Sequence, residues 1–345
     1  MSTWECELMR AAVVHGPRQM TIEEVPDPEP GPGEVVVAVA ANGLCGSDLH
    51  LYDGEWSLVR YPVIPGHEFA GEVMEVGADV DRSLVGRRMA VDPSIPCGSC
   101  DHCRAGRGNL CRNLGAFGLS RPGGCASHAT VGVDNLVPLP DSLPFEAAAV
   151  AQPLACAVHA LRRAEVAPGE RVLVVGGGAA GLLLAQAARA MGAGSVAVCE
   201  PITARRLVAA ELELDGVFAG VDEALAAHPE KFSLVVDATG KASVLPVSLT
   251  AADVGATLLL FGVCAQGEAA AIEPVTLYER ELKVVASRGL NATHQAALAL
   301  LASGRVRWEP LVTDRHLLGD LPDAMGRLRR GEGIKAVTVA AGATR

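Results

Sequence analysis

The sequence predicts an α/β protein with two domains, one a β-rich, barrel-like lobe and the other a doubly wound parallel sheet. At 345 residues, the chain exceeds the ~250–300 residues at which a single hydrophobic core usually stops growing. Its first part, residues 9–140, is rich in glycine, proline and short β-type runs. Residues 155–286 instead alternate short apolar runs with helical stretches, a pattern typical of a parallel sheet covered on both faces.

The first lobe is expected to consist of short strands separated by turn-forming segments. We expect strands at residues 35–39, 69–76 and 89–91, with turns such as residues 26–33 between them. The last part of the chain has a helical stretch near 295–303 and a terminal strand near 337–339, and we expect it to return to this lobe. The first domain would then comprise residues 1–154 and 290–345, including a loop lobe at about 93–115.

The second domain, residues 155–289, shows the alternation of strands and helices most clearly. Successive strands joined by helices in this way run parallel and form one sheet. We expect strands at 171–175, 195–199, 234–237, 256–262 and 283–286, and helices at 179–191, 204–212 and 242–251.

Composition and charge exclude several classes of function. The net charge is −11 and no block of lysine or arginine occurs, which argues against nucleic acid or an anionic membrane as a partner. The longest apolar runs, such as 172–175 and 258–261, fall far short of the ~20 residues of a membrane span. The first ten residues carry acids and a tryptophan rather than a secretion signal, so we expect a cytoplasmic protein.

A glycine-rich turn lies where a parallel sheet would bind a dinucleotide. Gly176, Gly178 and Gly181 form the pattern G-x-G-x-x-G directly after the apolar run 172–175 and at the start of a helical stretch. The first glycine permits a tight turn, the second admits a pyrophosphate close to the backbone, and the third lets the helix pack on the strand. Free N–H groups at the start of the helix would face the phosphates.

An acidic residue and two arginines bear on which dinucleotide binds. Glu200 ends the next strand, where its carboxylate can accept hydrogen bonds from the ribose hydroxyls and repel a 2′-phosphate. This position favours NAD over NADP. Arg205 and Arg206 keep the alternative open, because a nearby guanidinium could bind a 2′-phosphate.

Four of the ten cysteines are clustered, and the others are scattered along the chain. Clustered cysteines in an intracellular chain indicate a metal site rather than disulfides. Four thiolates can close a tetrahedral shell around Zn²⁺ and leave no position for a substrate, which indicates a structural site. An iron–sulfur cluster, which also takes four cysteines, is the alternative. The clustered residues are Cys97, Cys100, Cys103 and Cys111.

Residues suited to a second, catalytic metal lie in three other segments, at 43–50, 66–68 and 152–154. A zinc ion that polarises an alcohol needs a few protein ligands and one open position. Cys45 and His67 would supply a thiolate and an imidazole, and Glu68 and Gln152 are oxygen donors within plausible reach.

Neighbouring residues would serve this metal and its substrate. Ser47 and His50 can form a hydroxyl–imidazole relay that carries the proton of the alcohol to solvent. Asp48 can fix the tautomer of His67 by accepting a hydrogen bond from its ring.

These motifs resemble those of the zinc-containing medium-chain dehydrogenases and reductases, the family of alcohol, polyol and threonine dehydrogenases. The match runs from residue 9 to the C-terminus, and its markers are residues 45–50, Gly66-His67-Glu68, the four-cysteine lobe and the glycine-rich turn. The resemblance implies a GroES-like catalytic domain, a Rossmann coenzyme domain and a cleft between them that holds the catalytic zinc. It also implies homodimers or homotetramers.

The same resemblance implies two zinc ions in each chain. Cys45 and His67 would be ligands of the catalytic zinc, with Glu68 a ligand or near-ligand and Ser47 in contact with the substrate oxygen. The four clustered cysteines would hold the structural zinc. Candidates for the substrate pocket are Trp56, Phe117, Arg288 and Asn291.

One position departs from polyol-type relatives, which usually have Glu-Pro-Leu where this chain has Gln152-Pro153-Leu154, as some sugar dehydrogenases do. Zn²⁺ with one thiolate, one imidazole and one carboxylate sums to zero charge, whereas with Gln152 the site keeps a charge of +1. A more positive zinc depresses the pKa of a bound alcohol further, although an amide binds the metal more weakly. Movement of Glu68 onto the metal would restore neutrality.

The expected function is hydride transfer between NAD and the secondary alcohol of a polyol, sugar, cyclitol or amino alcohol. Two alternatives stay open. One is a metal-independent reductase or epimerase on the same scaffold, which Gln152 keeps open. The other is a non-catalytic nucleotide-binding protein, against which the Ser47 and His50 pair argues.

Overall fold

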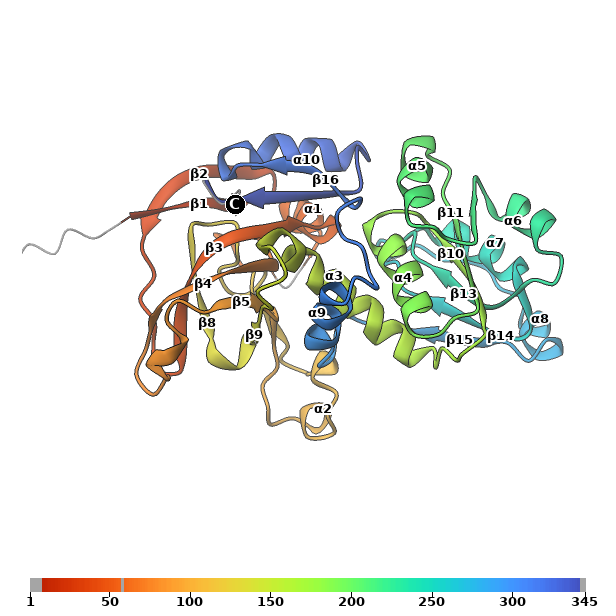
Figure 1. Ribbon diagram of the computed structural model, residues 1–345, viewed down its shortest axis with the longest axis horizontal. Coiled ribbons are helices and arrows are strands. Elements are labelled where there is room, and N and C mark those ends of the chain that lie inside the picture. Colours follow the sequence, from red (N-terminus) through yellow and green to blue (C-terminus); the bar gives the residue numbers. More distant parts are fainter. Residues whose placement is uncertain (1–7, 57–58, 342–345) are drawn as a thin grey trace, which may run out of the picture. The chain divides into compact units, whose positions relative to one another are not determined.

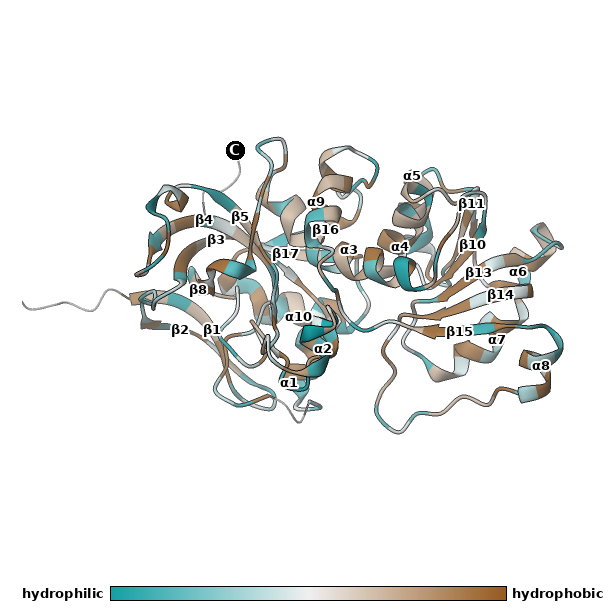
Figure 2. Ribbon diagram, turned by 90° about the horizontal axis from the view of Figure 1, so that it is seen from below, coloured by the Kyte–Doolittle hydropathy of each residue, from teal (hydrophilic) through white to brown (hydrophobic). Residues whose placement is uncertain are grey.

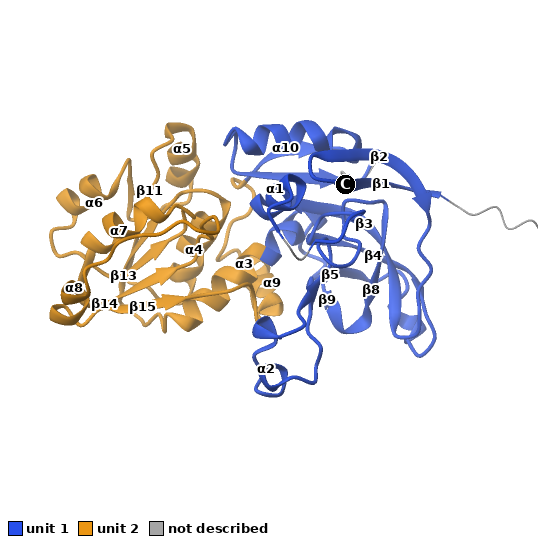
Figure 3. Ribbon diagram, turned by 180° about the vertical axis from the view of Figure 1, so that it is seen from behind, with its two compact units in different colours: residues 1–152, 312–345 blue, residues 153–311 orange. Residues whose placement is uncertain are grey.

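The computed structural model describes residues 8–56 and 59–341, so the N-terminal segment with Cys6 lies outside the described part. The chain divides into two compact units, residues 1–152 with 312–345 (unit 1) and residues 153–311 (unit 2), as Figure 3 shows. The first break lies within helix α3 (Phe145–Arg163), near the boundary expected at 154/155. The second falls at 311/312 and differs from the boundary expected at 289/290.

Residues 290–311 belong to unit 2 because their polar contacts are with its helices. Thr293 donates a hydrogen bond from Oγ1 to the carbonyl of Ala155 in α3 at 2.7 Å. The side-chain amide of Gln186, in helix α4 (Ala179–Ala190), exchanges hydrogen bonds of 3.1 and 2.7 Å with the backbone of Arg307. Helix α9 (His294–Ala302) lies between these anchors along the chain, so the return to unit 1 begins only with strand β16.

Unit 1 is the expected β-rich lobe, and its strands follow runs rich in valine and alanine. Its seven-stranded sheet has the order β16-β17-β3-β4-β5-β9, and β8 pairs with the first half of β3 (Figure 1). Alternate side chains such as Val35 and Val37 of β3 pack against Phe69 and Val73 of β4 in the core. The strands are β1 (Leu8–Gly16), β2 (Gln19–Pro26), β3 (Glu34–Leu44), β4 (Glu68–Val76), β5 (Arg88–Val91), β6 (Ser94–Ile95), β7 (Gly115–Ala116), β8 (His128–Gly132), β9 (Leu136–Pro138), β16 (Val312–His316) and β17 (Lys335–Val339). The helices are α1 (Gly46–Asp53), α2 (Asp101–Arg104) and α10 (Leu321–Arg329).

The pairing of β3 brings three distant segments together at the end of that strand. Gly43 pairs with Glu68 of β4, and Leu44 pairs with Ala336 of β17. Strand β3 then leads through Cys45 into helix α1. The residues around positions 45, 68 and 335 are therefore neighbours, although most of the chain separates the first from the last.

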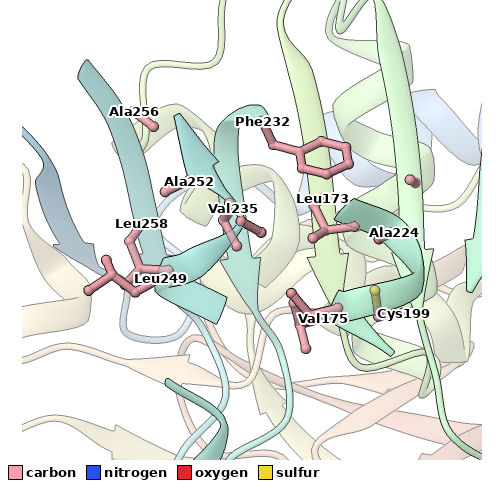
Figure 4. Packing of buried hydrophobic residues seen from close by; sticks show 13 residues of the cluster. Leu173, Val175, Cys199, Ala224, Phe232, Val235, Leu249, Ala252, Ala256 and Leu258 are labelled. Atoms are coloured by element: carbon pink, nitrogen blue, oxygen red, sulfur yellow. The ribbon is translucent and has the colours of Figure 1, made fainter. Parts of the chain in front are cut away.

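Unit 2 contains the expected parallel sheet, with the strand order β12-β11-β10-β13-β14-β15. Numbered within the unit, this is 3-2-1-4-5-6, the order of a doubly wound dinucleotide-binding fold. Its central strands are strongly hydrophobic (Figure 2), and Leu173, Val235 and Leu258 pair on adjacent strands and pack in one core (Figure 4). The strands are β10 (Arg171–Val175), β11 (Ser195–Cys199), β12 (Gly216–Phe218), β13 (Phe232–Asp237), β14 (Ala252–Leu260) and β15 (Lys283–Ala286). The remaining helices are α5 (Thr203–Glu211), α6 (Val221–Ala227), α7 (Leu245–Thr250) and α8 (Pro274–Glu279).

One expected helix of unit 2 is divided. The segment 242–251 forms a 3₁₀ turn at Ala242–Val244 followed by α7, because Pro246 has no backbone N–H and fits only the first turn of a new helix. The expected strand at 256–262 begins earlier, at Ala252. No helix in the described part of the chain is long and apolar enough to cross a membrane.

Candidate functional site

Three candidate metal ligands meet in unit 1. The ligand atoms of Cys45, His67 and Glu68 all lie within 4.8 Å of one another. Cys45 precedes the first residue of α1 at the end of β3, His67 lies directly before β4, and Glu68 is the first residue of β4. The strand pairing described above therefore assembles the cluster from segments that are separate in the sequence.

Two glycines leave room for this cluster. A Cβ on Gly43 would overlap Oε2 of Glu68 and lie 2.7 Å from the carbonyl oxygen of Ala149 in α3. Gly66 has a φ of +96°, and a Cβ there would lie 2.7 Å from Oδ1 of Asn42. A larger residue at either position would displace the neighbours of His67 or Glu68, which explains why these positions are glycine.

Asp48 fixes both Cys45 and His67. Its carboxylate is buried and accepts a hydrogen bond from the backbone N–H of Cys45 at 2.9 Å, which closes the start of α1. Its second oxygen, Oδ1, lies 3.4 Å from Nδ1 of His67, at ion-pair distance but without the alignment of a hydrogen bond. Nδ1 thus faces a carboxylate, and Nε2 faces the hydroxyl of Ser47 at 3.2 Å.

The electrostatics of the cluster favour a cation. Burial lowers the pKa of His67, but the charges of Asp48 and Cys45 and hydrogen bonds to them raise it by more, so this pKa lies well above its usual range. Burial raises the pKa of Asp48, but the charges of His67 and Lys335 and the hydrogen bonds from His67 and Cys45 together outweigh it, so the pKa of Asp48 is lowered. Oε1 of Glu68 is buried without a hydrogen-bond partner in the described part of the chain. A thiol, an imidazole and a carboxylate oxygen of this kind form a donor set that suits Zn²⁺.

Lys335 is a member of the site that sequence reasoning missed. Its ammonium forms a buried ion pair with Oε2 of Glu68 and donates to the carbonyl of Leu44 at 3.1 Å. Its signal in the sequence was a lysine at the start of the otherwise apolar strand β17, directly after Ile334. A lysine in a buried strand needs a buried counter-charge, but the identity of that partner required the fold.

Ser47 and His50 both lie on α1, but the two members of the expected relay are not directly connected. Among the described residues, no hydrogen bond joins them, and the hydroxyl of Ser47 faces His67 instead. His50 binds Oε2 of Glu55 through Nδ1 at 2.5 Å and stacks on Trp56 with ring centroids 6.3 Å apart. Sequence reasoning also missed Glu55.

The position of Glu55 follows from the end of α1. Gly54 has a φ of +78° and ends the helix, and the backbone N–H of Glu55 then donates to the carbonyl of His50 at 3.0 Å. This return of the chain places the two side chains together. A glycine directly after a helical segment was the signal that could have indicated the contact.

The remaining candidates for the site, from both units, have mixed outcomes. Gln152 lies on α3 one helical turn beyond Ala149, whose carbonyl faces Gly43, and is followed by Pro153. Phe117 is buried and packs edge-on against Phe69, with centroids 6.4 Å apart, so it belongs to the core rather than to a substrate pocket. Arg288 and Asn291 lie in unit 2.

The four clustered cysteines also converge. Their sulfur atoms lie within 4.8 Å of one another, and Sγ of Cys100 is 3.5 Å from Cys103 and 3.9 Å from Cys111. A tetrahedron with metal–sulfur distances of about 2.3 Å has edges of about 3.8 Å, so these separations match a shell around one ion. Backbone and side-chain hydrogen bonds from Ser99 lower the pKa of Cys97 to about 6, whereas burial raises the pKa of Cys103 to about 12. All four are free thiols rather than disulfides.

The glycine-rich turn in unit 2 has the form that its pattern predicts. Gly176 has a φ of +107°, and a Cβ on Gly181 would overlap the carbonyl oxygen of Gly176. Gly178 caps α4, and a Cβ there would meet no protein atom within 4 Å. The space above Gly178 and the N–H groups of α4 fit the pyrophosphate of a dinucleotide. The turn lies between β10 and β13, where the strand order reverses.

Glu200 lies directly against this turn. The buried carboxylate accepts backbone hydrogen bonds from Gly177 and Ile202, both at 2.9 Å. Arg206 donates to the carbonyls of Glu200 and Pro201 at 2.8 and 2.7 Å, so one of the two arginines beside Glu200 is tied to the backbone. Arg205 is the next candidate for contact with a nucleotide and lies on α5. A pocket of about 160 Å³ at the carboxyl ends of β13 and β14, lined in part by Asp237, adjoins the same edge of the sheet.

Comparisons with known proteins agree with the fold of both units. The alcohol dehydrogenase GroES-like domain matches residues 31–141, and the zinc-binding dehydrogenase domain matches residues 179–303. A D-altritol 5-dehydrogenase of Agrobacterium fabrum is 37% identical over 87% of this chain and 90% of its own length. An L-threonine 3-dehydrogenase of Chelativorans sp. is 32% identical over 96% and 98%. The crystal structure of a protein described as a zinc-binding dehydrogenase, from Sinorhizobium meliloti, bound to NADP, superposes with a TM-score of 0.92 at 33% identity over 97% of this chain and all of that one.

Proposed function

The chain belongs to the family of zinc-binding alcohol dehydrogenases, and from this premise we propose that it oxidises a secondary alcohol of a polyol, sugar, cyclitol or amino alcohol with NAD as hydride acceptor. The observation that carries this proposal is the meeting of Cys45, His67 and Glu68 at the end of β3. The relatives named above act on a polyol and on an amino alcohol, which supports the substrate class. They do not favour a metal-independent reductase or a non-catalytic protein.

Cys45 and His67 would hold the catalytic zinc, with Gln152 as a third, neutral donor. When bound, the ion polarises the hydroxyl oxygen of the substrate and lowers its pKa. Because Nδ1 of His67 faces Asp48, the tautomer that donates from Nδ1 leaves Nε2 free as the metal ligand.

Glu68 would remain beside the metal rather than on it. Its charge is balanced by Lys335, and movement of the carboxylate would leave the buried ammonium without a partner. Loss of a partner from a buried pair typically costs ~3–5 kcal/mol. With Gln152 as the third ligand, the metal and its ligands would keep a net charge of +1, which would lower the pKa of the substrate hydroxyl further.

Ser47 and His50 would move the proton. Ser47 lies 3.2 Å from Nε2 of His67, beside the position of the substrate oxygen, and can accept the hydroxyl proton while passing on its own. His50 binds Glu55 through Nδ1, so its Nε2 is the acceptor that releases the proton to solvent. A water molecule would bridge the two residues. The coenzyme, when bound, would accept the carbinol hydrogen as hydride, so that the overall reaction gives a ketone, NADH and one proton.

The coenzyme, the second metal and the assembly are part of the same proposal. The carboxylate of Glu200 beside the glycine-rich turn favours NAD, although one similar structure holds NADP. The four-cysteine lobe would hold a structural zinc, which makes two zinc ions per chain. Free thiols at nine described cysteines fit the reducing conditions of the cytoplasm.

A homodimer or homotetramer would cover an exposed part of unit 2. Strand β15 is the edge of the six-stranded sheet, and Val284 on it is exposed. Val275 and Tyr278 on α8, directly before it, are exposed as well. An apolar, unpaired sheet edge is a liability unless another chain covers it.

The experiment that tests the function is NADH formation from NAD⁺ with a panel of polyols, aldoses, cyclitols and amino alcohols, with and without a zinc chelator. We expect turnover on one class and its loss with chelator. Turnover that is indifferent to chelator, or no turnover on any alcohol, would contradict the proposal.

A further inference from the structure

A second site lies in unit 1, apart from the metal cluster. A pocket of about 410 Å³ opens between the β1–β2 hairpin, the end of α1 and helix α10, and α10 lies beside α1 (Figures 1 and 2). This volume is within the range of small-molecule sites, about 300–1,000 Å³. Its walls are mostly apolar, and two arginines stand at its rim. The lining includes Met20, Tyr52, Pro322 and Met325 with Arg18 and Arg329.

One carboxylate holds both arginines in place. Asp53, the last residue of α1, accepts from Nε of Arg18 at 3.0 Å and from Nη2 of Arg329 at 3.0 and 2.9 Å. The Asp53 side chain is 11% exposed, whereas Arg18 and Arg329 are 71% and 44% exposed. Two positive charges therefore meet one negative charge, and the group keeps a net charge of +1.

The arginines retain donors that point to an anion. Arg18 uses only Nε, and Arg329 uses only Nη2, so both terminal nitrogens of Arg18 and Nε and Nη1 of Arg329 bond no other described residue. A guanidinium with free parallel N–H donors, here the two terminal nitrogens of Arg18, binds a carboxylate in a bidentate manner, and Arg329 can add single hydrogen bonds. Because Asp53 already fixes these groups, a ligand would not have to order them.

The turn that carries Arg18 is also held rigidly. Arg18 has a φ of +61°, its N–H donates to the carbonyl of Tyr52 at 2.6 Å, and the hydroxyl of Tyr52 donates to its carbonyl at 3.1 Å. The polar end of Tyr52 is thus used by the backbone. Its ring and the thioethers of Met20 and Met325 provide soft apolar contacts for a hydrocarbon body.

We propose that this pocket binds a small organic carboxylate with an apolar body of one ring or a branched chain. The carboxylate would contact Arg18 and Arg329, and the body would lie on Met20, Tyr52 and Met325. The binding is independent of the proposed dehydrogenase activity, because no lining residue belongs to the metal cluster or to the glycine-rich turn. An occupant would nevertheless contact α1, the helix that bears Ser47 and His50.

Titration calorimetry of the zinc-loaded full chain with cyclohexanecarboxylate tests the proposal. Cyclohexanecarboxamide has the same body without the charge, and acetate has the charge without the body. We expect one site per chain for cyclohexanecarboxylate and at least about tenfold weaker binding of both comparison compounds.

Two variants separate this pocket from other sites. Arg18→Gln removes donors from an exposed side chain, so folding is not at stake, and Arg329→Gln leaves Asp53 paired with Arg18. Each should weaken binding about tenfold or more, whereas Arg330→Gln, an exposed neighbour paired with Glu332 outside the pocket, should not. Equal affinity in wild type and in both pocket variants would place the carboxylate elsewhere, for example at the metal. That result, equal binding of the carboxamide, or no binding at millimolar concentrations would overturn the proposal.

Discussion

Replacing Lys335 by methionine tests the buried ion pair that holds Glu68 beside the metal cluster. The side chains of Glu68 and Lys335 are 0% and 4% exposed, so the substitution leaves a carboxylate without its counter-charge where water cannot compensate. Breaking such a pair from one side costs ~3–5 kcal/mol of unfolding free energy. For a unit of this size, about 2–4 °C of Tm is lost per kcal/mol, so we expect Tm to fall by roughly 6–20 °C.

A double-mutant cycle separates the pair from simple loss of packing. Glu68→Gln alone leaves the ammonium unpaired and should also destabilise, whereas the double variant removes both charges and should recover most of the loss. Lys241→Met, at an exposed lysine, is the matched control and should change the unfolding free energy by no more than about 0.5 kcal/mol. Urea unfolding of zinc-loaded protein is the assay. Destabilisation of Lys335→Met by less than about 1 kcal/mol, or strictly additive effects, would refute the reasoning.

The pH dependence of this pair has a definite sign. Burial lowers the pKa of Lys335, but the charges of Glu68, Cys45 and Asp48 and the hydrogen bond to Glu68 together raise it by more, so its pKa in the folded protein lies above the usual value. The pair therefore stabilises the fold fully below the pKa of an unfolded lysine, near ~10.4, and loses this contribution as the pH rises through the folded value. Destabilisation by Lys335→Met should accordingly shrink only at strongly alkaline pH.

Further predictions concern the coenzyme turn and a buried histidine. Gly178→Ala should leave Tm unchanged but weaken NADH binding in a fluorescence titration, because its Cβ meets only the space for the pyrophosphate. Gly181→Ala should lower both Tm and the affinity for NADH, because its Cβ would clash with Gly176. Equal behaviour of the two variants would contradict this account. Glu200→Ala should raise the ratio of kcat/KM for NADP over that for NAD by about tenfold, since the carboxylate no longer repels the 2′-phosphate, and an unchanged ratio would remove Glu200 from coenzyme choice. Burial lowers the pKa of His316, so the folded protein loses stability as the pH falls below ~6.5, at up to ~1.4 kcal/mol per pH unit; His316→Gln should flatten this slope in urea unfolding, and an unchanged slope would exclude His316 as its source.

Local patterns were sufficient to predict the fold class, which the strand orders and the relatives confirm. Short apolar runs predicted the strands at 171–175, 195–199 and 283–286 with the bounds seen in the structure. The domain boundary expected near 290 differs from the observed one because nothing in the sequence of α9 indicates which unit it packs against. Its neighbours Thr293 and Arg307 bind helices more than a hundred positions earlier, which only the fold reveals.

The candidate site was predictable where its ligands stand in short motifs. The Gly66-His67-Glu68 segment and the four cysteines each indicate a metal site from a short stretch of sequence, and the structure brings the ligand atoms of each set together. The ion pair of Lys335 with Glu68 spans 267 positions, so no spacing rule could indicate it. The expected relay between Ser47 and His50 was not found, for another reason. The two residues are three positions apart on one helix and so lie on one face, but this spacing does not fix which neighbour each side chain binds.

The central claim is that Cys45 and His67 hold a zinc ion needed for alcohol oxidation. The most direct test is the zinc content of purified Cys45→Ser, measured beside alcohol-dependent NADH formation on the same sample, with Cys264→Ser, an exposed cysteine outside both clusters, as control. We predict two zinc ions per chain in wild type and in Cys264→Ser, full turnover in wild type, and one zinc ion without turnover in Cys45→Ser. Retention of two zinc ions or of NADH formation by Cys45→Ser would contradict the account.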